Sequence, residues 1–597
     1  MKSFLNWLDS RTGCKKILHE ALYEKVPGGA RWRYVWGSTL TFALVVQFIT
    51  GFFLWLAYNP SSQTAWESVY YIQNHMTGGW LLRGIHHFTA QAMNVLLVLH
   101  LMQVVIDGAY KAPREVNFWF GFLLLLLVLA LSLTGYLLPW DQKGFWATKV
   151  ATSLVVMTPL IGPDLQRLIV GGADYGHHTL ARFFALHAGF LPAAIVALLV
   201  GHIYLFRRHG LTVKEPRKGA DTTFWPDQVL KDAVACLAVL ATVLFLVLAW
   251  RGADLGPPAD PTENYSAARP EWYFLFLFQL LKYFKGESAI WGAIIIPSLM
   301  LLVLALMPFF GKWRLGHRFN IGFLLALFAG AGLLTWQAID KDQKNPTYVT
   351  GVKAAQRDAQ RVKVLAAAHG IPTSGAVNLL REDAYTQGPK LFARNCASCH
   401  RYDGHDGLGA PPKDAPSAAD LKGFASREWL EGLMDPAKVS TSNYFGGTKF
   451  ANGKMVRFVK KDVAGYTPEQ KAQLRKVIIA LSAEAKLQSQ TTADTKDAPD
   501  IAAGRELLKG DINCTECHAF GAPDEDATGP DLTGYGSREW LISFISDPAH
   551  TKLYGKRNDR MPRFAEEKIL DAKAIGLIAD WLRGEWYEPT ATASVAH

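Results

Sequence analysis

Charged residues are scarce in this chain: Asp, Glu, Lys and Arg make up 19% of its 597 residues, while half of the residues are hydrophobic. The scarcity is uneven. Long apolar runs dominate up to about residue 338, and after that point no run is long enough to cross a bilayer. The length also exceeds that of one ordinary core. We therefore expect several units, with a membrane-embedded N-terminal part and a soluble C-terminal part.

Cysteine is also rare, with 6 residues, of which four fall in two short motifs described below. Cys14 and Cys236 lie far apart, in an amphipathic segment and in an apolar run, so we expect no disulfide between them. The first 30 residues lack the apolar stretch of a signal peptide, so we expect no cleavable leader. The net charge is +10, but basic loops fix the topology of membrane proteins and steer soluble partners. We therefore expect no nucleic-acid partner.

Seven apolar segments reach or approach the ~20 residues that cross a hydrocarbon core. They cover about 35–58, 79–107, 117–138, 183–206, 233–250, 290–310 and 319–338. Basic clusters flank the first, second, fourth and sixth segments: Arg11, Lys15 and Lys16; Lys111 and Arg114; Arg207, Arg208, Lys214, Arg217 and Lys218; Lys312, Arg314 and Arg318. All four clusters lie on one side if the N-terminus is cytoplasmic, as the positive-inside rule predicts. Seven spans then place the residues after 338 on the outer side.

Four histidines recur at a spacing that suits haem. His86 and His100 are 14 residues apart in the second segment, and His187 and His202 are 15 apart in the fourth. Each pair spans ~21–22 Å of helix on roughly one face. A single buried histidine is as often structural, but four at matched spacing favour ligation of two stacked haems. The topology pairs His86 with His187 on the outer side and His100 with His202 on the inner side.

Glycines repeat the same period in the first and third segments. Gly37 and Gly51 are 14 residues apart, and so are Gly121 and Gly135. Glycine permits close approach of a flat macrocycle to a helix, although small residues also serve helix packing. The match with the histidine period favours clearance for haem.

On these residues, the segment from about 30 to 338 resembles cytochrome b of the bc1 and b6f complexes. The 15-residue step, the stretch 138–149 (Leu-Pro-Trp-Asp-Gln-Lys-Gly-Phe-Trp-Ala-Thr-Lys) and the seven spans resemble cytochrome b6 joined to subunit IV. His87 is not expected to be a ligand, because the 14-residue step belongs to His86. In b6 a cysteine near the first helix carries an extra haem, but Val35 aligns there, so we do not expect that haem.

The resemblance also implies two quinone sites. Pro270-Glu271-Trp272-Tyr273 resembles the PEWY motif of the outer quinol site, where a carboxylate would accept a proton from quinol. Tyr136 and Trp140 would form the opposing wall. The alternative is an ordinary loop anchored by interfacial aromatic residues.

On the inner side, residues 224–232 resemble the loop before the fifth helix of the family. Arg207 matches an inner-site arginine, and Arg207, Lys231 and Asp232 are candidates for proton delivery to quinone, or else form a charged cytoplasmic rim. Arg83 and Arg182 are expected to pair with haem propionates, or else to anchor helix ends.

The soluble part carries two C-x-x-C-H motifs, the attachment signal of c-type haem. Their residues are Cys396, Cys399 and His400, and Cys514, Cys517 and His518. The spacing between the motifs is far too long for a zinc finger.

The motifs sit in an internal repeat, since the residues 420–430 recur as 531–541. Each copy then reaches a methionine, Met455 or Met561, whose thioether as sixth ligand would raise the haem potential. Met434 is the rival of Met455, but it has no counterpart in the second copy, and core packing is its default role.

The sequence thus predicts a mostly α fold: a seven-helix transmembrane cytochrome b bundle with two small α-helical cytochrome c domains. The expected units are an N-terminal segment 1–34, a b6-like domain 35–218, a subunit IV-like domain 219–340, a linker 341–385, c domains 386–485 and 501–597, and a hinge 486–500. The expected cofactors are two haems b and two haems c, with quinol or quinone as substrate.

The predicted function is oxidation of quinol at the outer site, with one electron crossing the two b haems, the other passing to the c haems, and protons translocated. No Rieske cluster motif occurs in the chain, so this interpretation requires a separate Rieske iron–sulfur protein. A soluble or membrane-bound cytochrome as acceptor and a homodimeric complex in a bacterial inner membrane, with the c domains periplasmic, follow from the resemblance. The alternatives are a linear quinol dehydrogenase or membrane anchor that feeds a periplasmic reductase, and a passive electron-wire subunit.

Overall fold

The computed structural model describes residues 2–212 and 219–589, and it divides into two compact units. The first contains Met1–Val362 and Ile371–Val377, and the second contains Lys363–Gly370 and Asn378–His597. The predicted basic residues Lys214, Arg217 and Lys218 and the chain end 590–597 lie outside the described residues.

The elements up to the long helix that joins both units are α1 (Lys2–Thr12), α2 (Cys14–Leu22), β1 (Lys25–Val26), η1 (Trp32–Tyr34), α3 (Val35–Trp55), α4 (Ala65–Asn74), α5 (Gly79–Ile106), α6 (Glu115–Leu137), α7 (Gln142–Val155), α8 (Gly162–Val170), α9 (His177–Phe184), η2 (Ala185–Phe190), α10 (Leu191–His209), β2 (Thr222–Thr223), η3 (Phe224–Gln228), α11 (Val229–Trp250), η4 (Trp272–Phe274), α12 (Leu275–Leu281), η5 (Gly286–Ser288), η6 (Trp291–Ile295), α13 (Ile296–Ala305), α14 (Met307–Phe310), α15 (Gly316–Gln343) and α16 (Pro346–His369).

The remaining elements are α17 (Val377–Arg381), α18 (Ala384–Asn395), α19 (Arg427–Leu433), α20 (Lys454–Lys461), η7 (Val463–Gly465), α21 (Pro468–Glu484), η8 (Gln488–Gln490), α22 (Thr491–Lys496), α23 (Ala498–Lys509), η9 (Cys514–Glu516), α24 (Arg538–Ser546), η10 (Gly555–Arg557) and α25 (Ala572–Arg583).

Seven helices among the described residues are long and apolar enough to cross a membrane, which confirms the predicted number. They cover Trp32–Trp55, Gly79–Ile106, Glu115–Leu137, His177–His209, Phe224–Trp250, Gly286–Ala305 and Gly316–Gln343. The fourth starts earlier than predicted because α9 continues through η2 into α10 without a break. The predicted mostly α-helical fold is likewise confirmed, because the only named strands in the described residues are β1 and β2.

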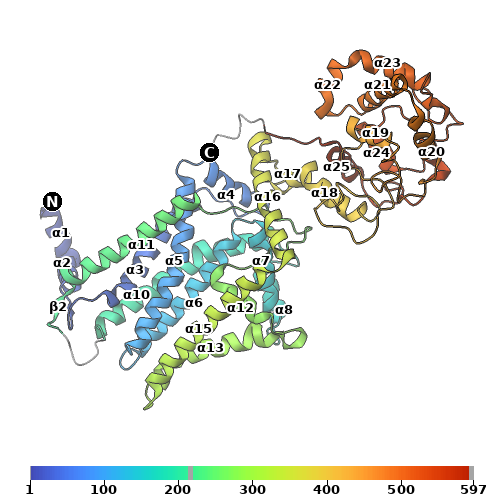
Figure 1. Cartoon of the computed structure of the whole chain (residues 1–597). Coiled ribbons are helices and arrows are strands. Elements are labelled where there is room, and N and C mark those ends of the chain that lie inside the picture. Colours follow the sequence, from blue (N-terminus) through green and yellow to red (C-terminus); the bar gives the residue numbers. More distant parts are fainter. Residues whose placement is uncertain (1, 213–218, 590–597) are drawn as a thin grey trace. The chain divides into compact units, whose positions relative to one another are not determined.

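The first four spans form a bundle by two pairings. α3 packs against α5, and α6 packs against α10, while α5 also contacts α6 (Figure 1). α11 lies against α3 and α5. Apolar side chains fill the centre of the bundle, among them the buried Ala43, Met93 and Ile195. The histidines of α5 and of η2–α10 therefore face a shared interior.

A strand pairing and two hydrogen bonds tie the N-terminal segment to the loop before α11. β1 pairs antiparallel with β2, with Lys25 opposite Thr223. Gly28 N donates to Asp221 Oδ1 at 2.9 Å, and Arg31 N donates to Gln228 Oε1 at 2.9 Å. These bonds hold the N-terminal ends of α3 and α11 together.

The predicted linker 341–385 is largely helical. α16 begins after a short break from α15, and Tyr348 on α16 stacks under Arg269, 4.4 Å from the guanidinium carbon to the ring centre. Gly351 fits closely against Ser266, because a Cβ there would lie 2.2 Å from the serine Oγ. The first half of α16 thus packs on the loop that precedes Glu271.

The second unit is built on the internal repeat. In both copies a serine caps a helix: Ser426 Oγ accepts from Trp429 N, and Ser537 Oγ accepts from Trp540 N, each at 3.2 Å. The tryptophan indoles then donate to the carbonyls of Asp420 and Asp531, nine residues upstream. Capping and anchoring therefore explain why Ser-Arg-Glu-Trp recurs.

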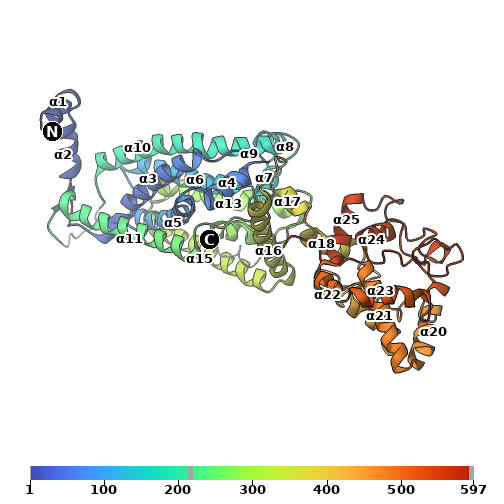
Figure 2. The same ribbon diagram turned by 90° about the horizontal axis from the view of Figure 1, so that it is seen from above.

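The helices of the second unit pair across the two predicted c-domain ranges, 386–485 and 501–597. α18 packs against α25, and α21 packs against α23 (Figures 1 and 2). The predicted hinge 486–500 contains η8, α22 and the start of α23. Two carboxylates of this segment bind the guanidinium group of Arg427: Asp494 Oδ1 lies 2.6 Å from Nη2, and Asp497 Oδ2 lies 2.5 Å from Nη1. The division into separate c domains therefore stays a prediction.

Candidate functional site

The outer imidazole pair lies between α5 and η2. The ring centres of His86 and His187 are 6.4 Å apart. That separation leaves room for one metal ion with bonds of about 2 Å to each facing nitrogen. Gly51 and Gly135 flank the pair: a Cβ would lie 3.2 Å from His86 Cε1 at Gly51 and 2.7 Å from His187 Cε1 at Gly135. Each imidazole is thus seated against a helix that has no side chain at that point.

Threonine hydroxyls orient both outer imidazoles. Thr50 Oγ1 lies 2.9 Å from His86 Nδ1, and Thr134 Oγ1 lies 3.1 Å from His187 Nδ1. Each hydroxyl also donates its single hydrogen to a helix carbonyl, Val46 O at 2.7 Å or Ala130 O at 2.9 Å. The hydroxyl oxygens must therefore accept from Nδ1–H, which leaves each Nε2 with a free lone pair for a metal.

These threonines were not predicted, yet the sequence carries a signal for them. The dipeptide Thr-Gly occurs at 50–51 in α3 and again at 134–135 in α6. The hydroxyl therefore orients the same imidazole against which the adjacent glycine packs.

The inner imidazole pair lies between α5 and α10, with the ring centres of His100 and His202 6.5 Å apart. His202 Nδ1 donates to Asn117 O at 3.0 Å, which again leaves Nε2 free. A Cβ would lie 3.6 Å from His100 Cε1 at Gly37 and 3.2 Å from His202 Cε1 at Gly121.

A small pocket lies beside both inner histidines. Its other lining residues are Gly121 and seven apolar side chains: Leu97, Leu101, Val104, Phe118, Phe122, Leu125 and Leu304. An apolar cavity with two imidazoles suits a hydrophobic macrocycle ligated through iron. The donors, their spacing and the glycine clearance thus fit a bis-histidine haem at each level.

The π-helix η2 accounts for the unequal histidine spacings. His187 lies within η2, whose wider turn adds one residue to the path between His187 and His202. The 15-residue step in η2–α10 therefore presents its histidines as the 14-residue step does in α5. π-turns inside α-helices are frequent at functional sites, and nothing in the local sequence predicts this one.

The predicted outer quinol motif contacts the predicted opposing segment. Glu271 directly precedes η4, and its Oε1 accepts from Lys143 Nζ on α7 at 2.6 Å. The side chain of Glu271 is 15% exposed and that of Lys143 is 43% exposed. Burial alone would lower the pKa of Lys143, but the charge of Glu271 and the hydrogen bond to it outweigh burial, so the pKa is raised. Lys143 was not predicted as a site residue, although it lies inside the 138–149 stretch.

Two of the aromatic candidates, Tyr136 and Tyr273, lie near Glu271, whereas Trp140 packs in a buried cluster with Phe145. Burial raises the pKa of Tyr273, and the nearby charge of Glu271 and Tyr136 add to that effect. Trp140 is 5% exposed and has a positive φ of 50°, a strained conformation for a bulky residue. Its backbone carbonyl accepts from Ala259 N at 3.0 Å.

The turn that follows Trp140 is fixed by Asp141. The carboxylate caps α7 by accepting from Gly144 N at 2.8 Å and also accepts from Gly256 N at 3.1 Å. The start of α7, and with it Lys143, is therefore held against the loop that leads to Glu271.

The candidate propionate partners have other contacts. Arg83 donates to Gln73 Oε1 at 3.0 Å and to the carbonyls of Ala253 and Asp254 at 2.7 Å each. Arg182 donates to Leu168 O. Arg83 thus ties α5 to the loop after α11, and Arg182 ties α9 to α8. The pairing of either guanidinium group with a haem propionate stays a prediction.

The inner candidates bind separate partners. Arg207 donates to Glu24 Oε2 at 3.1 Å, and Lys231 Nζ lies 5.7 Å from the ring centre of Trp32. Asp232 is buried and accepts from Ser38 Oγ at 2.7 Å and Gln228 Nε2 at 2.8 Å. Arg207 lies near the C-terminal end of α10, and Lys231 and Asp232 lie near the N-terminal end of α11.

The two C-x-x-C-H motifs hold their histidines alike. His400 Nδ1 donates to Ala419 O at 2.8 Å, and His518 Nδ1 donates to Pro530 O at 2.7 Å. Burial raises the pKa of Cys396 to about 12 and that of Cys514 to about 11. Each Nε2 is free for iron, and the second cysteines, Cys399 and Cys517, complete the thiol pairs. The motifs fit covalent haem c.

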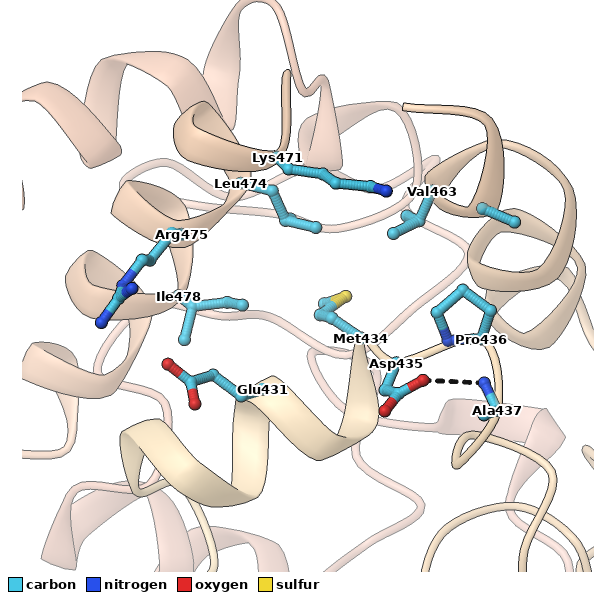
Figure 3. A pocket seen from close by; sticks show the side chains of 11 residues that line it. Glu431, Met434, Asp435, Pro436, Ala437, Val463, Lys471, Leu474, Arg475 and Ile478 are labelled. Atoms are coloured by element: carbon cyan, nitrogen blue, oxygen red, sulfur yellow. Dashed lines mark hydrogen bonds between the residues drawn. The ribbon is translucent and has the colours of Figure 1, made fainter. Parts of the chain in front are cut away.

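The methionines lie in two different cores. Met561 packs with Cys396 in one apolar cluster, and Met455 packs with Cys514 in the other. Met434 is buried in the second cluster and lines a surface pocket (Figure 3). The lining of that pocket runs over residues 431–478, which include neither C-x-x-C-H motif.

Three family models match the chain. Residues 91–261 match "Cytochrome b(N-terminal)/b6/petB", residues 258–353 match "Cytochrome b(C-terminal)/b6/petD", and residues 385–476 match "Cytochrome c".

Among similar proteins, the "Cytochrome b" of Rhodobacter capsulatus is 33% identical over 308 residues, which cover 49% of this chain and 70% of that protein. The "Menaquinol:cytochrome c reductase cytochrome b subunit" of Geobacillus thermodenitrificans is 38% identical over 220 residues, covering 36% of this chain and 98% of that protein. A solved chain titled "Hyperthermophilic respiratory Complex III" matches with a TM-score of 0.50 and 26% identity, over 60% of this chain and 95% of that one.

Proposed function

Since the chain belongs to the cytochrome b family of bc- and b6f-type complexes and carries a cytochrome c domain, we propose that it is the electron-carrying subunit of a quinol:cytochrome c-type oxidoreductase. It is a multi-pass membrane protein that works in a complex with other subunits. The proposed reaction oxidises quinol to quinone, which releases two electrons and two protons.

The observation that carries this proposal is the presence of two facing imidazole pairs at two levels of one bundle, with centres 6.4 and 6.5 Å apart. His86 and His187 would hold one haem b, and His100 and His202 the other. Bound haems at these pairs and at the two C-x-x-C-H motifs supply one-electron carriers. Two levels along a transmembrane helix allow one electron of each quinol to cross the membrane.

Glu271 is the proposed proton acceptor at the outer site. Its carboxylate accepts a hydrogen bond from Lys143, and this contact orients the carboxylate before quinol arrives. A quinol hydroxyl that displaces Lys143 from Glu271 would find an acceptor already in place. Tyr273, Tyr136 and Trp140 are the proposed wall against the quinone ring.

The inner residues have the complementary task. Arg207 would bind a quinone oxygen or orient Glu24, with which it forms an ion pair. Lys231 and Asp232 would pass protons from the cytoplasmic side. Uptake of protons on the inner side and release on the outer side amounts to proton translocation.

The proposal includes further subunits. A separate Rieske iron–sulfur protein would take the first electron of each quinol and pass it to the c-type haems, and the complex would be a homodimer. The positive-inside rule supports a bacterial inner membrane with the C-terminal c-type unit on the periplasmic side. A soluble or membrane-bound cytochrome would be the final acceptor.

Quinol-driven reduction of the purified complex tests the proposal. We expect both b- and c-type haems to be reduced, the reaction to be blocked by an outer-site inhibitor, and c-haem reduction to stop when the Rieske protein is removed. Inhibitor-insensitive reduction that does not depend on a Rieske protein would instead establish the linear quinol dehydrogenase.

A further inference from the structure

The two C-x-x-C-H motifs are completed by helices from opposite copies of the repeat. α18 leads into the first motif and packs against α25, the last helix of the second copy. Gly388 on α18 fits closely against Trp581 on α25, because a Cβ there would lie 2.2 Å from Trp581 Cβ. Trp581 also stacks on Tyr402, just after the first motif, with ring centres 4.2 Å apart. The first motif therefore rests on the end of the second copy.

The second motif shows the reciprocal arrangement. α23 leads into it and packs against α21, the last helix of the first copy. Gly504 on α23 is the close-approach residue here, since a Cβ would lie 2.1 Å from Lys476 O on α21. Glycine thus permits the helix crossing in both places, and both crossings join different copies.

The two methionines also pack across the two copies of the repeat. Met561 contacts the buried cluster that contains Phe392 and packs against Cys396, and Met455 contacts the cluster that packs against Cys514. Each methionine therefore shares a core with the cysteine of the other copy.

The two copies of the repeat contact each other within the repeated segments 420–430 and 531–541. Phe424 of the first copy and Tyr535 of the second pack with ring centres 5.3 Å apart. A Cβ on Gly536 would lie 2.3 Å from Ala425 Cβ, so the two copies of the segment lie directly against each other. From this contact each chain segment continues into the core of the other copy.

Resting on the proposed attachment of haem c, we infer that each c-type haem takes its sixth ligand from the other copy of the repeat: Met561 opposite His400, and Met455 opposite His518. Residues 427–535 then form one contiguous c-type domain, inserted between the two parts of the other, 378–425 and 537–589. The cytochrome c family model matches 385–476 in linear order, so two tandem copies have exchanged their C-terminal halves within one chain.

Single-haem chains test the ligand pairing in the assembled complex. In Cys396→Ala/Cys399→Ala, only the second motif binds haem, and Met455→Leu should then abolish the ferric iron–thioether absorption band and lower the midpoint potential. Met561→Leu should leave both unchanged in that background. In Cys514→Ala/Cys517→Ala, only the first motif binds haem. Met561→Leu should then abolish the band and lower the midpoint potential, and Met455→Leu should leave both unchanged.

Met434→Leu is the matched control for a methionine buried in the same core, and it should leave the band intact in both backgrounds. Three results would overturn the inference. The first is loss of the band in Met561→Leu when haem is bound only at the second motif, and the second is loss of the band in Met434→Leu. The third is a band that survives both Met455→Leu and Met561→Leu. Absence of any covalent haem in the unsubstituted chain would instead overturn the proposed function.

Zero-length carbodiimide cross-linking of the unsubstituted complex gives a second readout that does not depend on a variant folding. Lys573 Nζ lies 2.8 Å from Glu382 Oε1, and Lys476 Nζ lies 3.0 Å from Asp500 Oδ1. Each pair joins opposite copies, so peptides linked at Glu382–Lys573 and Asp500–Lys476 should be recovered. Recovery of links only within copies, between the α18 and α21 peptides or between the α23 and α25 peptides, would contradict the exchange.

Discussion

Replacing Gly135 by alanine is expected to disturb the outer haem site selectively. The added Cβ would lie 2.7 Å from His187 Cε1 and 3.3 Å from both ring nitrogens, whereas ordinary van der Waals contact begins at 3.4 Å. The imidazole or helix α6 must therefore move by about 0.7 Å, because overpacking forces side chains or backbone to shift. His187 would leave both its hydroxyl partner and the axis that it shares with His86.

The expected cost is about 1–3 kcal/mol. That range corresponds to a roughly 5- to 150-fold weaker retention of the outer haem. Helix propensity works in the opposite direction, because alanine stabilises a helix interior by about 0.5–1 kcal/mol relative to glycine. Any loss therefore reports the contact with His187.

Reduced-minus-oxidised spectra and a redox titration of the purified membranes provide the assay. We expect Gly135→Ala to lose or shift one of two b-type components and to leave the other unchanged. Gly189→Ala is the matched control, since Gly189 is two residues from His187 and a Cβ there has no neighbour within 4 Å. Full retention of both components in Gly135→Ala, or an equal loss in Gly189→Ala, would refute the reasoning.

Two further predictions concern the outer quinol site. Glu271→Gln should slow quinol oxidation by roughly 100-fold or more while the haem spectra stay intact, because general-base catalysis contributes about that much; unchanged turnover would remove Glu271 from the proton path. Lys143→Met should lower stability by only about 1 kcal/mol, because Lys143 is 43% exposed, but should also lower turnover. The raised pKa of Lys143 means that its contact with Glu271 is fully present below pH 10.5 and is lost only as the pH rises through the raised value. The ratio of wild-type to Lys143→Met turnover should therefore stay constant between about pH 6 and 9, and a ratio that falls to one within that range would show that Lys143 titrates there.

Periodic signals in the sequence were sufficient to predict the spans and to propose the histidine pairs. Apolar length predicts the seven transmembrane helices, and a step of 14 or 15 residues places His86 and His100, and likewise His187 and His202, on one helix face. The π-turn at His187 could not be predicted, because it depends on how η2 packs rather than on local composition.

Long-range contacts were the harder part. The ion pair of Lys143 with Glu271 joins residues 128 positions apart, and the backbone partners of Arg83 lie about 170 positions away. The repeat in the c-type unit favours two consecutive domains, because linear order is all that a repeat records. The pairing of α18 with α25 depends instead on the fit of Gly388 against Trp581, which only the folded chain reveals.

The most direct test of the account is to count haems after single histidine substitutions. His86→Ala and His187→Ala should each remove the same b-type haem, identified by its midpoint potential, and the double variant should remove no more. His100→Ala and His202→Ala should both remove the other b-type haem, with the c-type haems retained in all four variants. Loss of different haems in His86→Ala and His187→Ala, or retention of two b-type haems in either, would contradict the two facing imidazole pairs as the redox centre of this protein.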